Sequence, residues 1–150
     1  MKSVIAASAA VLLLAAAPLA HAAETAQEKA NKALVLKFWS DVFDHHDLSR
    51  VKDYMFEGYV QHNPNAATGR RGFEEFFGKI WPKPLAASEV KPTKFDVVMA
   101  DGDLVTLIQR IAKPDPDHAG QTYDSFWFDT LRVRDGKLVE HWDNAIKPVK

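Results

Sequence analysis

Apolar residues in the first part of the chain recur at the spacing of a helix. Leu34, Val35, Phe38, Trp39 and Val42 fall on one face of a 3.6-residue period. Thr25 and Glu28, which precede this run, have the form of a capping box, in which each side chain bonds the other residue's backbone. The pattern predicts an amphipathic helix over residues 26–43.

Further helical patterns follow. Asp47 is placed to cap a short helix through Leu48, Val51 and Tyr54, and residues 58–63 look extended and are stopped by Pro64. Between residues 68 and 82 the apolar positions again share one helical face, and they are Phe73, Phe76, Phe77, Ile80 and Trp81. Pro82 and Pro84 end this third helix.

From residue 89 onward the helical period is lost and β signals replace it. Strands are predicted over residues 95–100, 104–112, 122–133 and 137–146, with hairpin turns at Asp101-Gly102 and Asp135-Gly136 and a longer loop over 114–120. Helices followed by an antiparallel meander indicate an α+β fold, in which N-terminal helices cover the concave face of a curved mixed or antiparallel sheet.

The register of the last hairpin decides where its polar residues point. A two-residue loop at Asp135-Gly136 would put Arg132 beside Val139, and Leu131 beside Glu140, which mixes charge and core on both faces. A three-residue loop with Gly136 at positive φ instead pairs Val133 with Lys137, Leu131 with Val139, and Asp129 with His141. We prefer the second register.

In that register Asp129, His141 and Asp143 point inward together with Leu131 and Val133. Because a buried carboxylate is costly unless it is paired, this trio requires an explanation. It is either a self-satisfied polar network that fixes the strand pair, or the polar end of a ligand cavity under the sheet. The outer face would carry Trp142 and Phe128, which suggests a dimer contact there.

The N-terminus has the order of a secretory signal peptide. A lysine precedes an apolar run over residues 4–17, then Pro18 and the small-x-small sequence Ala20-His21-Ala22. The run has about 14 residues, fewer than the roughly 18 to 20 that span a bilayer. Residues 1–22 are therefore predicted to be removed, and residues 23–150 to form one periplasmic or secreted domain.

Composition narrows the classes of partner and site. The 19 basic and 20 acidic residues are mixed along the chain, so no footprint for nucleic acid or anionic membrane is visible. The chain has no cysteine, which excludes disulfides, thiolate metal sites and cysteine nucleophiles. No HxxxH or HxH spacing appears either, so we expect no metal site. The balanced charge leaves a small molecule or a second copy of the chain as the expected partner.

The motifs YVQHNP, the helix over residues 69–81 and FDTLRVRDGKLVEHWD together resemble the SnoaL-like polyketide cyclases of the nuclear-transport-factor-2-like superfamily. The resemblance covers residues 30–147 and is most specific in RVRDGKLVEHWD. It implies a cone-shaped α+β barrel, a pocket between sheet and helices, frequent dimerisation through the sheet, and an aspartate acting as acid/base without metal or cofactor. Asp143 matches that aspartate.

Two other groups share the architecture. Limonene epoxide hydrolases carry an acid that Asp143 also resembles, but they use an Arg-x-Asp that Arg110-Ile111-Ala112 lacks. Ketosteroid isomerases use a tyrosine with two acids, and no single stretch here matches that arrangement.

The resulting hypothesis is an apolar pocket with a polar end. Asp143 would be the general base, His141 would protonate the developing oxygen or orient the acid, and Asp129 would complete the trio. The predicted substrate-binding residues are His62, Gln109, Trp39, Tyr123 and Trp127. His62 could equally hydrogen-bond only its own turn, and a buried glutamine is often only structural. A non-catalytic carrier or sensor and a structural dimerisation module remain alternatives.

Overall fold

The computed structural model describes residues 23–148. In chain order its elements are α1 (Ala26–Phe38), η1 (Trp39–Asp44), η2 (Leu48–Arg50), α2 (Val51–Tyr54), β1 (Met55–Gln61), α3 (Arg70–Gly78), β2 (Val97–Asp101), β3 (Leu104–Pro114), β4 (Thr122–Arg134) and β5 (Lys137–Asp143). The signal peptide predicted over residues 1–22 lies outside the described residues. Within them, no helix combines the length and apolarity needed to cross a membrane.

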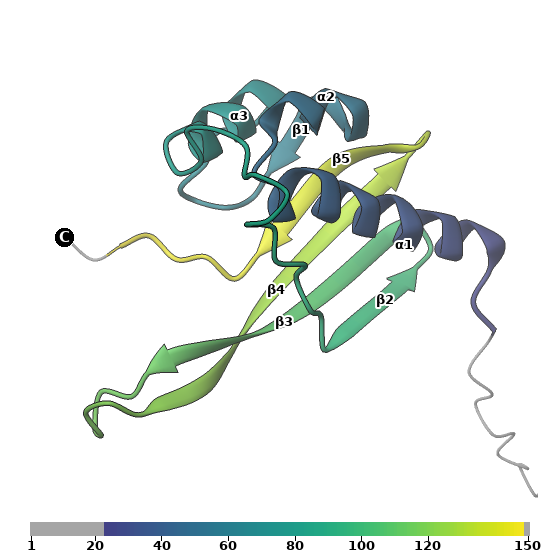
Figure 1. Ribbon diagram of the computed structural model, residues 1–150. Helices are drawn as coiled ribbons and strands as arrows, with labels where there is room; N and C mark the ends of the chain where they lie inside the picture. The colour runs from purple at the N-terminus through teal and green to yellow at the C-terminus, as the bar shows by residue number, and fades with distance from the viewer. Residues whose placement is uncertain (1–22, 149–150) are drawn as a thin grey trace, which may run out of the picture.

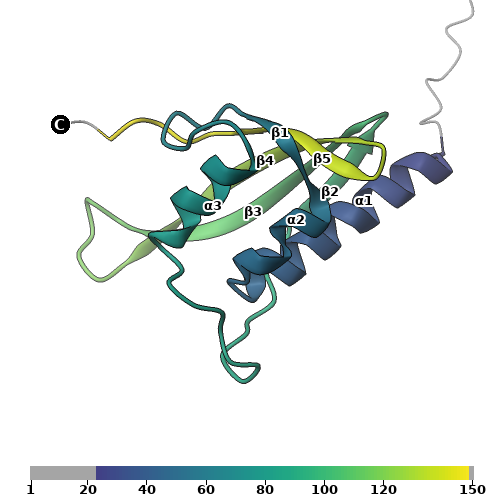
Figure 2. The ribbon, with the colours of Figure 1, turned by 90° about the horizontal axis from the view of Figure 1, so that it is seen from above.

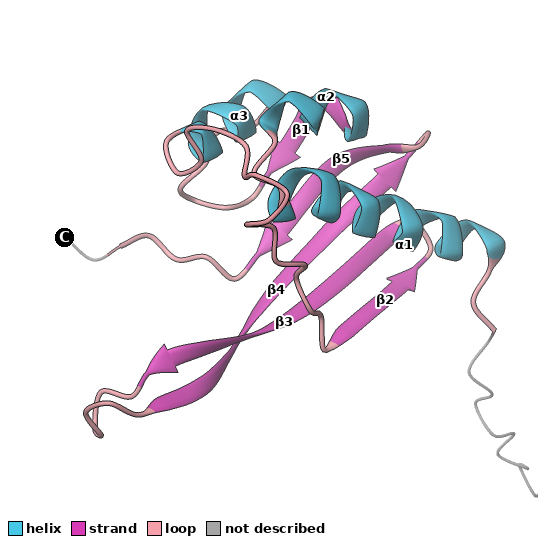
Figure 3. Ribbon diagram, in the orientation of Figure 1, coloured by secondary structure: helices cyan, strands magenta, loops and turns pink. Residues whose placement is uncertain are grey.

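The strands form one mixed sheet in the order β1-β5-β4-β3-β2, in which β1 runs parallel to β5 and the other neighbours are antiparallel. The helices lie on one side of this twisted sheet (Figures 1 and 2), and helices, strands and loops are distinguished in Figure 3. The predicted α+β cone with helices on the concave face is confirmed. The extended segment expected over residues 58–63 is β1, which already begins at Met55.

The first helix begins as predicted but does not continue as one α-helix. The Glu28 N–H donates to Thr25 Oγ1 (3.2 Å) and the Thr25 N–H to Glu28 Oε2 (2.7 Å), which is the expected capping box. After Phe38 the chain continues as a π-helical turn, η1. The rings of Trp39 and Phe43 stack within it, with their centroids 4.2 Å apart, so the wider turn presents a double aromatic surface to the interior.

The core lies between α1, η1 and the inner face of the sheet. Its fully buried residues are Val35, Phe38, Val42, Val51, Met55, Tyr59, Val105, Leu107 and Leu138. The third helix is shorter than predicted, since α3 ends at Gly78. Of the apolar residues on its face, only Phe73 is buried. Phe77 and Trp81 are partly buried against the core.

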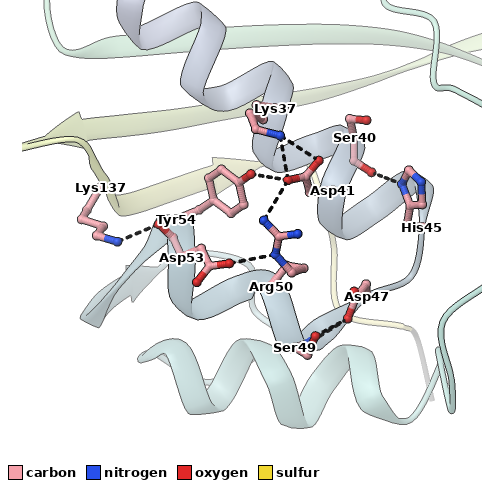
Figure 4. A network of polar contacts seen from close by, with 10 residues as sticks. All are labelled: Lys37, Ser40, Asp41, His45, Asp47, Ser49, Arg50, Asp53, Tyr54 and Lys137. Carbon is pink, nitrogen blue, oxygen red and sulfur yellow. Dashed lines mark hydrogen bonds and ion pairs between the residues drawn. The ribbon is translucent and has the colours of Figure 1, made fainter.

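A network around Asp41 joins η1 to α2 (Figure 4). Its carboxylate accepts a hydrogen bond from the Tyr54 hydroxyl and ion pairs from Lys37 (3.0 Å) and Arg50 (3.4 Å). The Tyr54 hydrogen bond, followed by the charges of Lys37 and Arg50, holds the pKa of Asp41 below its ordinary value. Both carboxylate oxygens of Asp41 have hydrogen-bond partners, as is typical of a network that stabilises the fold.

The last hairpin has a register that the sequence did not predict. Asp135 (φ 49°) and Gly136 (φ 68°) form a two-residue turn, so Arg134 pairs with Lys137 and Val133 with Leu138. The positive φ of Gly136 is confirmed, but the pairing of Asp129 with His141 is wrong.

A β-bulge explains how charge and core still separate. Val139 is the extra residue between two pairs, since Val133 faces Leu138 and Arg132 faces Glu140. The bulge shifts the strand by one residue, so that Leu131 pairs with His141 and Asp129 with Asp143. The polar trio therefore points inward as predicted, although Leu138 replaces Val139 in the core.

The loop between β1 and α3 packs closely on that helix. A Cβ on Gly72 would lie 2.2 Å from the carbonyl oxygen of Ala67 and 2.7 Å from its carbonyl carbon. Glycine is required there by close backbone approach rather than by φ. This contact fixes the segment that carries Asn63, Asn65 and Ala66 to the body of the domain.

Candidate functional site

A cavity of about 400 Å³ lies between the inner face of the sheet and the helices. Its helical side is lined by six aromatic side chains, which are Phe38, Trp39, Phe43, Phe73, Phe76 and Phe77. Ile111, Trp127 and Leu131 line it from the sheet, together with Gln109. The structure thus places Trp39, Gln109 and Trp127 in the wall of the cavity.

Asp129, His141 and Asp143 form the polar end of this cavity. They meet because β4 and β5 are neighbours and the bulge in β5 turns His141 and Asp143 to the face of the sheet that carries Asp129. Nε2 of His141 lies 3.0 Å from Oδ1 of Asp129, and both side chains are buried. Trp127 Nε1 also donates to Asp129 Oδ1 over 3.3 Å, so this oxygen has two partners.

The second oxygen of Asp129 is different. Oδ2 is buried and has no hydrogen-bond partner, and no other buried side-chain nitrogen or oxygen in residues 23–148 shares that condition. An unpartnered buried acceptor costs free energy, and the cost is larger when it carries charge.

Asp143 is held by donors on both of its oxygens. Asn63 Nδ2 donates to Oδ2 (2.6 Å) and the Ala145 N–H donates to Oδ1 (2.9 Å). The Asn65 N–H donates to Oδ1 of Asn63 (2.9 Å), which fixes the orientation of the Asn63 amide. The two donors hold both oxygens of Asp143, so its carboxyl group is fixed at the edge of an apolar space.

Tyr59 lies beside the trio on the inner face of β1 and is 1% exposed. Burial, followed by the negative charges of Asp129 and Asp143, raises the pKa of its phenol well above the ordinary value. The hydroxyl therefore stays protonated and can only donate or accept a neutral hydrogen bond. A tyrosine and two acids, which no single stretch of sequence matched, are brought together here from β1, β4 and β5.

His62 does not enter the cavity, contrary to the prediction. Residues of β1 alternate, so Tyr59 and Gln61 point inward while Val60 and His62 point outward. His62 stacks on Trp142 (centroids 5.0 Å apart) and its Nε2 lies 2.9 Å from Glu140 Oε1. Its position belongs to the outer face of the sheet.

Tyr123 is also outside the cavity. It lies near the far end of the long β3–β4 hairpin, paired with Lys113 and 49% exposed. Because β5 ends at Asp143, opposite Asp129, that part of β4 has no β5 neighbour (Figure 1). The aromatic residue was placed correctly on a strand but too far from the body of the domain.

The motif YVQHNP contributes residues that the sequence reasoning missed. Asn63 holds Asp143, Tyr59 lies beside the acids, and Gln61 Oε1 lies 2.9 Å from Nδ1 of His141. The two-residue spacing of Tyr59 and Gln61 on a strand would have indicated that they share a face. Asn63 leaves the strand, and nothing in the sequence showed its direction.

The trio also has the composition of a small cation site. One atom from each of Asp129, His141 and Asp143 lies within 4.8 Å of the others. However, Nε2 of His141 is directly hydrogen-bonded to Asp129, and both oxygens of Asp143 already accept hydrogen bonds. A cation would have to displace the hydrogen bond between His141 and Asp129, so the observed geometry is that of side chains joined by hydrogen bonds.

Comparison with known proteins now identifies the family. No curated protein sequence matches the chain. Among solved structures it is similar to a protein assigned as a SnoaL-like polyketide cyclase from Jannaschia sp. CCS1, with 18% identity, 81% of this chain and 90% of that one covered, and a TM-score of 0.57. It is also similar to IdmH, assigned as a polyketide cyclase, from Streptomyces antibioticus (18%, 75% and 89%, 0.52).

An LEH-like epoxide hydrolase from M. tuberculosis has the same fold, at 14% identity with 78% of this chain and 83% of that chain covered and a TM-score of 0.54. At these identities the structural matches establish the fold and leave the chemistry to the site. The sequence model of the SnoaL-like domain matches residues 35–141, which is most of the described chain. The protein therefore belongs to the SnoaL-like domain family.

Proposed function

We propose that this SnoaL-like protein binds a small hydrophobic molecule containing a carbonyl group and acts on it by acid/base chemistry without a cofactor. The observation that carries the proposal is Asp143, a carboxylate fixed by Asn63 and Ala145 at the polar end of a largely apolar cavity. The apolar wall would hold the carbon skeleton of the ligand. The polar end would meet its oxygen and the adjacent acidic C–H.

In this mechanism Asp143 removes a proton from a carbon next to the carbonyl group, and the electron pair moves to the carbonyl oxygen. Hydrogen-bond donors beside that oxygen stabilise the charge that develops on it. The Tyr59 hydroxyl, which burial keeps protonated, is suited to this role. A positioned base contributes roughly 10² to 10⁴-fold to a rate, which is enough for an activated C–H of the aldol or isomerisation type.

The test substitutes Asp143→Asn, which keeps the size of the side chain and deletes the base. Candidate ligands come from mass spectrometry of molecules that copurify with the protein. An enzyme should lose turnover by at least about 10²-fold while retaining most of its ligand affinity. Asp117→Asn, an exposed change in the β3–β4 loop, is the matched control. Unchanged turnover in Asp143→Asn would refute the assignment of the base.

A non-catalytic carrier or sensor is the second candidate. It is favoured by the predominance of aromatic side chains in the cavity wall, which suits binding as well as reaction. In that case Asp143→Asn changes affinity and no turnover exists to be lost. A purely structural dimerisation module predicts no cavity, and the space of about 400 Å³ argues against it.

We further propose that the domain is exported and dimerises through the outer face of the sheet. The outer face exposes Phe56, Met99, Phe126 and Phe128, whereas Trp142 is partly covered by His62 and by Arg132. Light scattering should give the dimer mass, and Phe128→Glu should reduce it to the monomer mass.

For export, the intact mass of protein from the native host should correspond to a chain that begins near Ala23. A mass that includes residues 1–22 would contradict export by cleavage.

A further inference from the structure

The hydrogen bonds around Gln61 define which of its amide atoms faces the site. The backbone N–H of Asn63 donates to the Gln61 side chain over 2.9 Å, and the atom it meets is Oε1. A backbone N–H can only donate, so the opposite orientation of the amide would place two donors against each other. The oxygen of Gln61 is therefore fixed by its own loop, independently of His141.

The same oxygen lies 2.9 Å from Nδ1 of His141. Since this oxygen only accepts, Nδ1 must carry a proton. The other ring nitrogen, Nε2, lies 3.0 Å from Oδ1 of Asp129. Two lone pairs would repel at this distance, so a second proton lies between Nε2 and Oδ1.

We propose that Gln61 is a positioning residue that holds His141 with a proton on Nδ1, so that the His141–Asp129 pair always contains a second, shared proton. The pair then exists as imidazolium with carboxylate or as imidazole with carboxylic acid. Both forms are neutral overall, and they differ only in the position of one proton along the 3.0 Å contact. The common form of a histidine–aspartate pair, with a bare Nδ1, is not available.

The consequence for the cavity is a division of roles. His141 has no free lone pair and cannot accept a proton from a ligand. A neutral pair also places no net charge beside Asp143, so repulsion between the two acids is removed. Among the described residues that line the cavity, Asp143 then holds the one carboxylate available as a base. The protonation of His141 follows from the hydrogen bonds alone, whereas the role of Asp143 rests on the proposed function.

The experiment is long-range ¹H–¹⁵N correlation of the histidine rings in ligand-free protein near neutral pH. The chain has 6 histidines, and the His141 ring is assigned by its loss in His141→Gln. We expect a directly bonded proton on Nδ1 in the wild type. In Gln61→Leu, which removes the acceptor, that proton should be lost from Nδ1 and the ring proton found on Nε2, facing Asp129.

Two further variants separate positioning from general packing. Gln61→Glu retains an acceptor opposite Nδ1 and should keep the Nδ1 proton. Gln109→Leu removes the other glutamine of the cavity wall. It should also leave the Nδ1 proton in place, because the acceptor at Nδ1 of His141 is Gln61. A general loosening of the cavity would affect Gln61→Leu and Gln109→Leu alike.

A wild-type spectrum in which Nδ1 is bare and only Nε2 bears a proton would overturn the inference, and this result needs no variant. Retention of the Nδ1 proton in a folded Gln61→Leu protein would also overturn the role of Gln61. Because the spectra use no ligand and no turnover, they can succeed when the proposed catalysis fails. Conversely, an active enzyme with a bare Nδ1 would leave the proposed function standing and this inference refuted.

Discussion

Gly72 and Gly78 lie in the same helix, α3, and offer a matched pair of alanine substitutions. At Gly72 a Cβ would lie 2.2 Å from the carbonyl oxygen of Ala67, which is backbone and cannot rotate away. At Gly78 the nearest atom is a methyl carbon of Leu48 at 3.8 Å, an ordinary contact. Neither glycine has the positive φ that would strain an alanine, so the main difference between the two sites is the space available for a Cβ.

The expected energies have opposite signs. Alanine in place of glycine inside a helix stabilises by roughly 0.5 to 1 kcal/mol, and Gly78→Ala should show part of this gain because it lies at the helix end. Overpacking at a rigid contact costs typically about 1 to 3 kcal/mol, occasionally more. A contact of 2.2 Å against backbone belongs at the upper end of that range, so Gly72→Ala should be destabilised by about 2 kcal/mol after the helical gain is subtracted.

Urea unfolding followed by tryptophan fluorescence measures both variants against the wild type. A thermal melt should agree, with Gly72→Ala lowered by several degrees, since 1 kcal/mol shifts the Tm of a domain of this size by roughly 3 to 6 °C. The loop that Gly72 contacts carries Asn63, so ligand affinity should fall in this variant as well. Equal stabilities of Gly72→Ala and Gly78→Ala would show that the loop does not pack on α3 as described.

Three further outcomes are expected. Because the folded-state pKa of Asp41 is lowered, its ionised form stabilises the protein above the unfolded pKa of about 3.9, and this contribution is lost as pH falls through the lower folded value. Wild type should therefore be more stable than Asp41→Asn by about 1 kcal/mol at neutral pH, and this difference should shrink below about pH 4. A difference that persists in acid would contradict the reasoning. Gly136→Val, at φ 68°, should cost about 1 to 2 kcal/mol in urea unfolding, and no loss would mean that the turn differs. Asn63→Leu should lower turnover or ligand affinity while the melting temperature changes little; full activity would show that Asp143 needs no such donor.

Local patterns predicted most of the fold. The capping box at Thr25 and the alternation of the strands depend only on residues that are close together in the chain, so both can be predicted from the sequence. The π-helical turn at Trp39–Asp44 was not predicted, because its apolar residues fit an α-helix equally well. The start of β1 was predicted three residues too late, because the strand begins at Met55 directly after the short helix α2, with no turn between them.

The candidate site was predicted in part. The trio of Asp129, His141 and Asp143 was predicted because charged residues on an inward face need an explanation. His62 and Tyr123 were misplaced, since the sequence shows neither which face of β1 is covered nor where β5 ends along β4. Asn63 and Gln61 were missed as site residues because their roles come from contacts with Asp143 and His141, far away in the chain.

The single extra residue at Val139 determines which face of the sheet each later residue of β5 occupies. If the strand kept Val139 but paired without the bulge, Leu131 would face Glu140 and Thr130 would face His141, which would turn Trp142 toward the cavity and His141 and Asp143 toward solvent. The amino acids of the site would all still be present in the gene product. An alignment of this strand with a relative that lacks the bulge must therefore open a gap near residue 139, or it will equate cavity residues with surface residues.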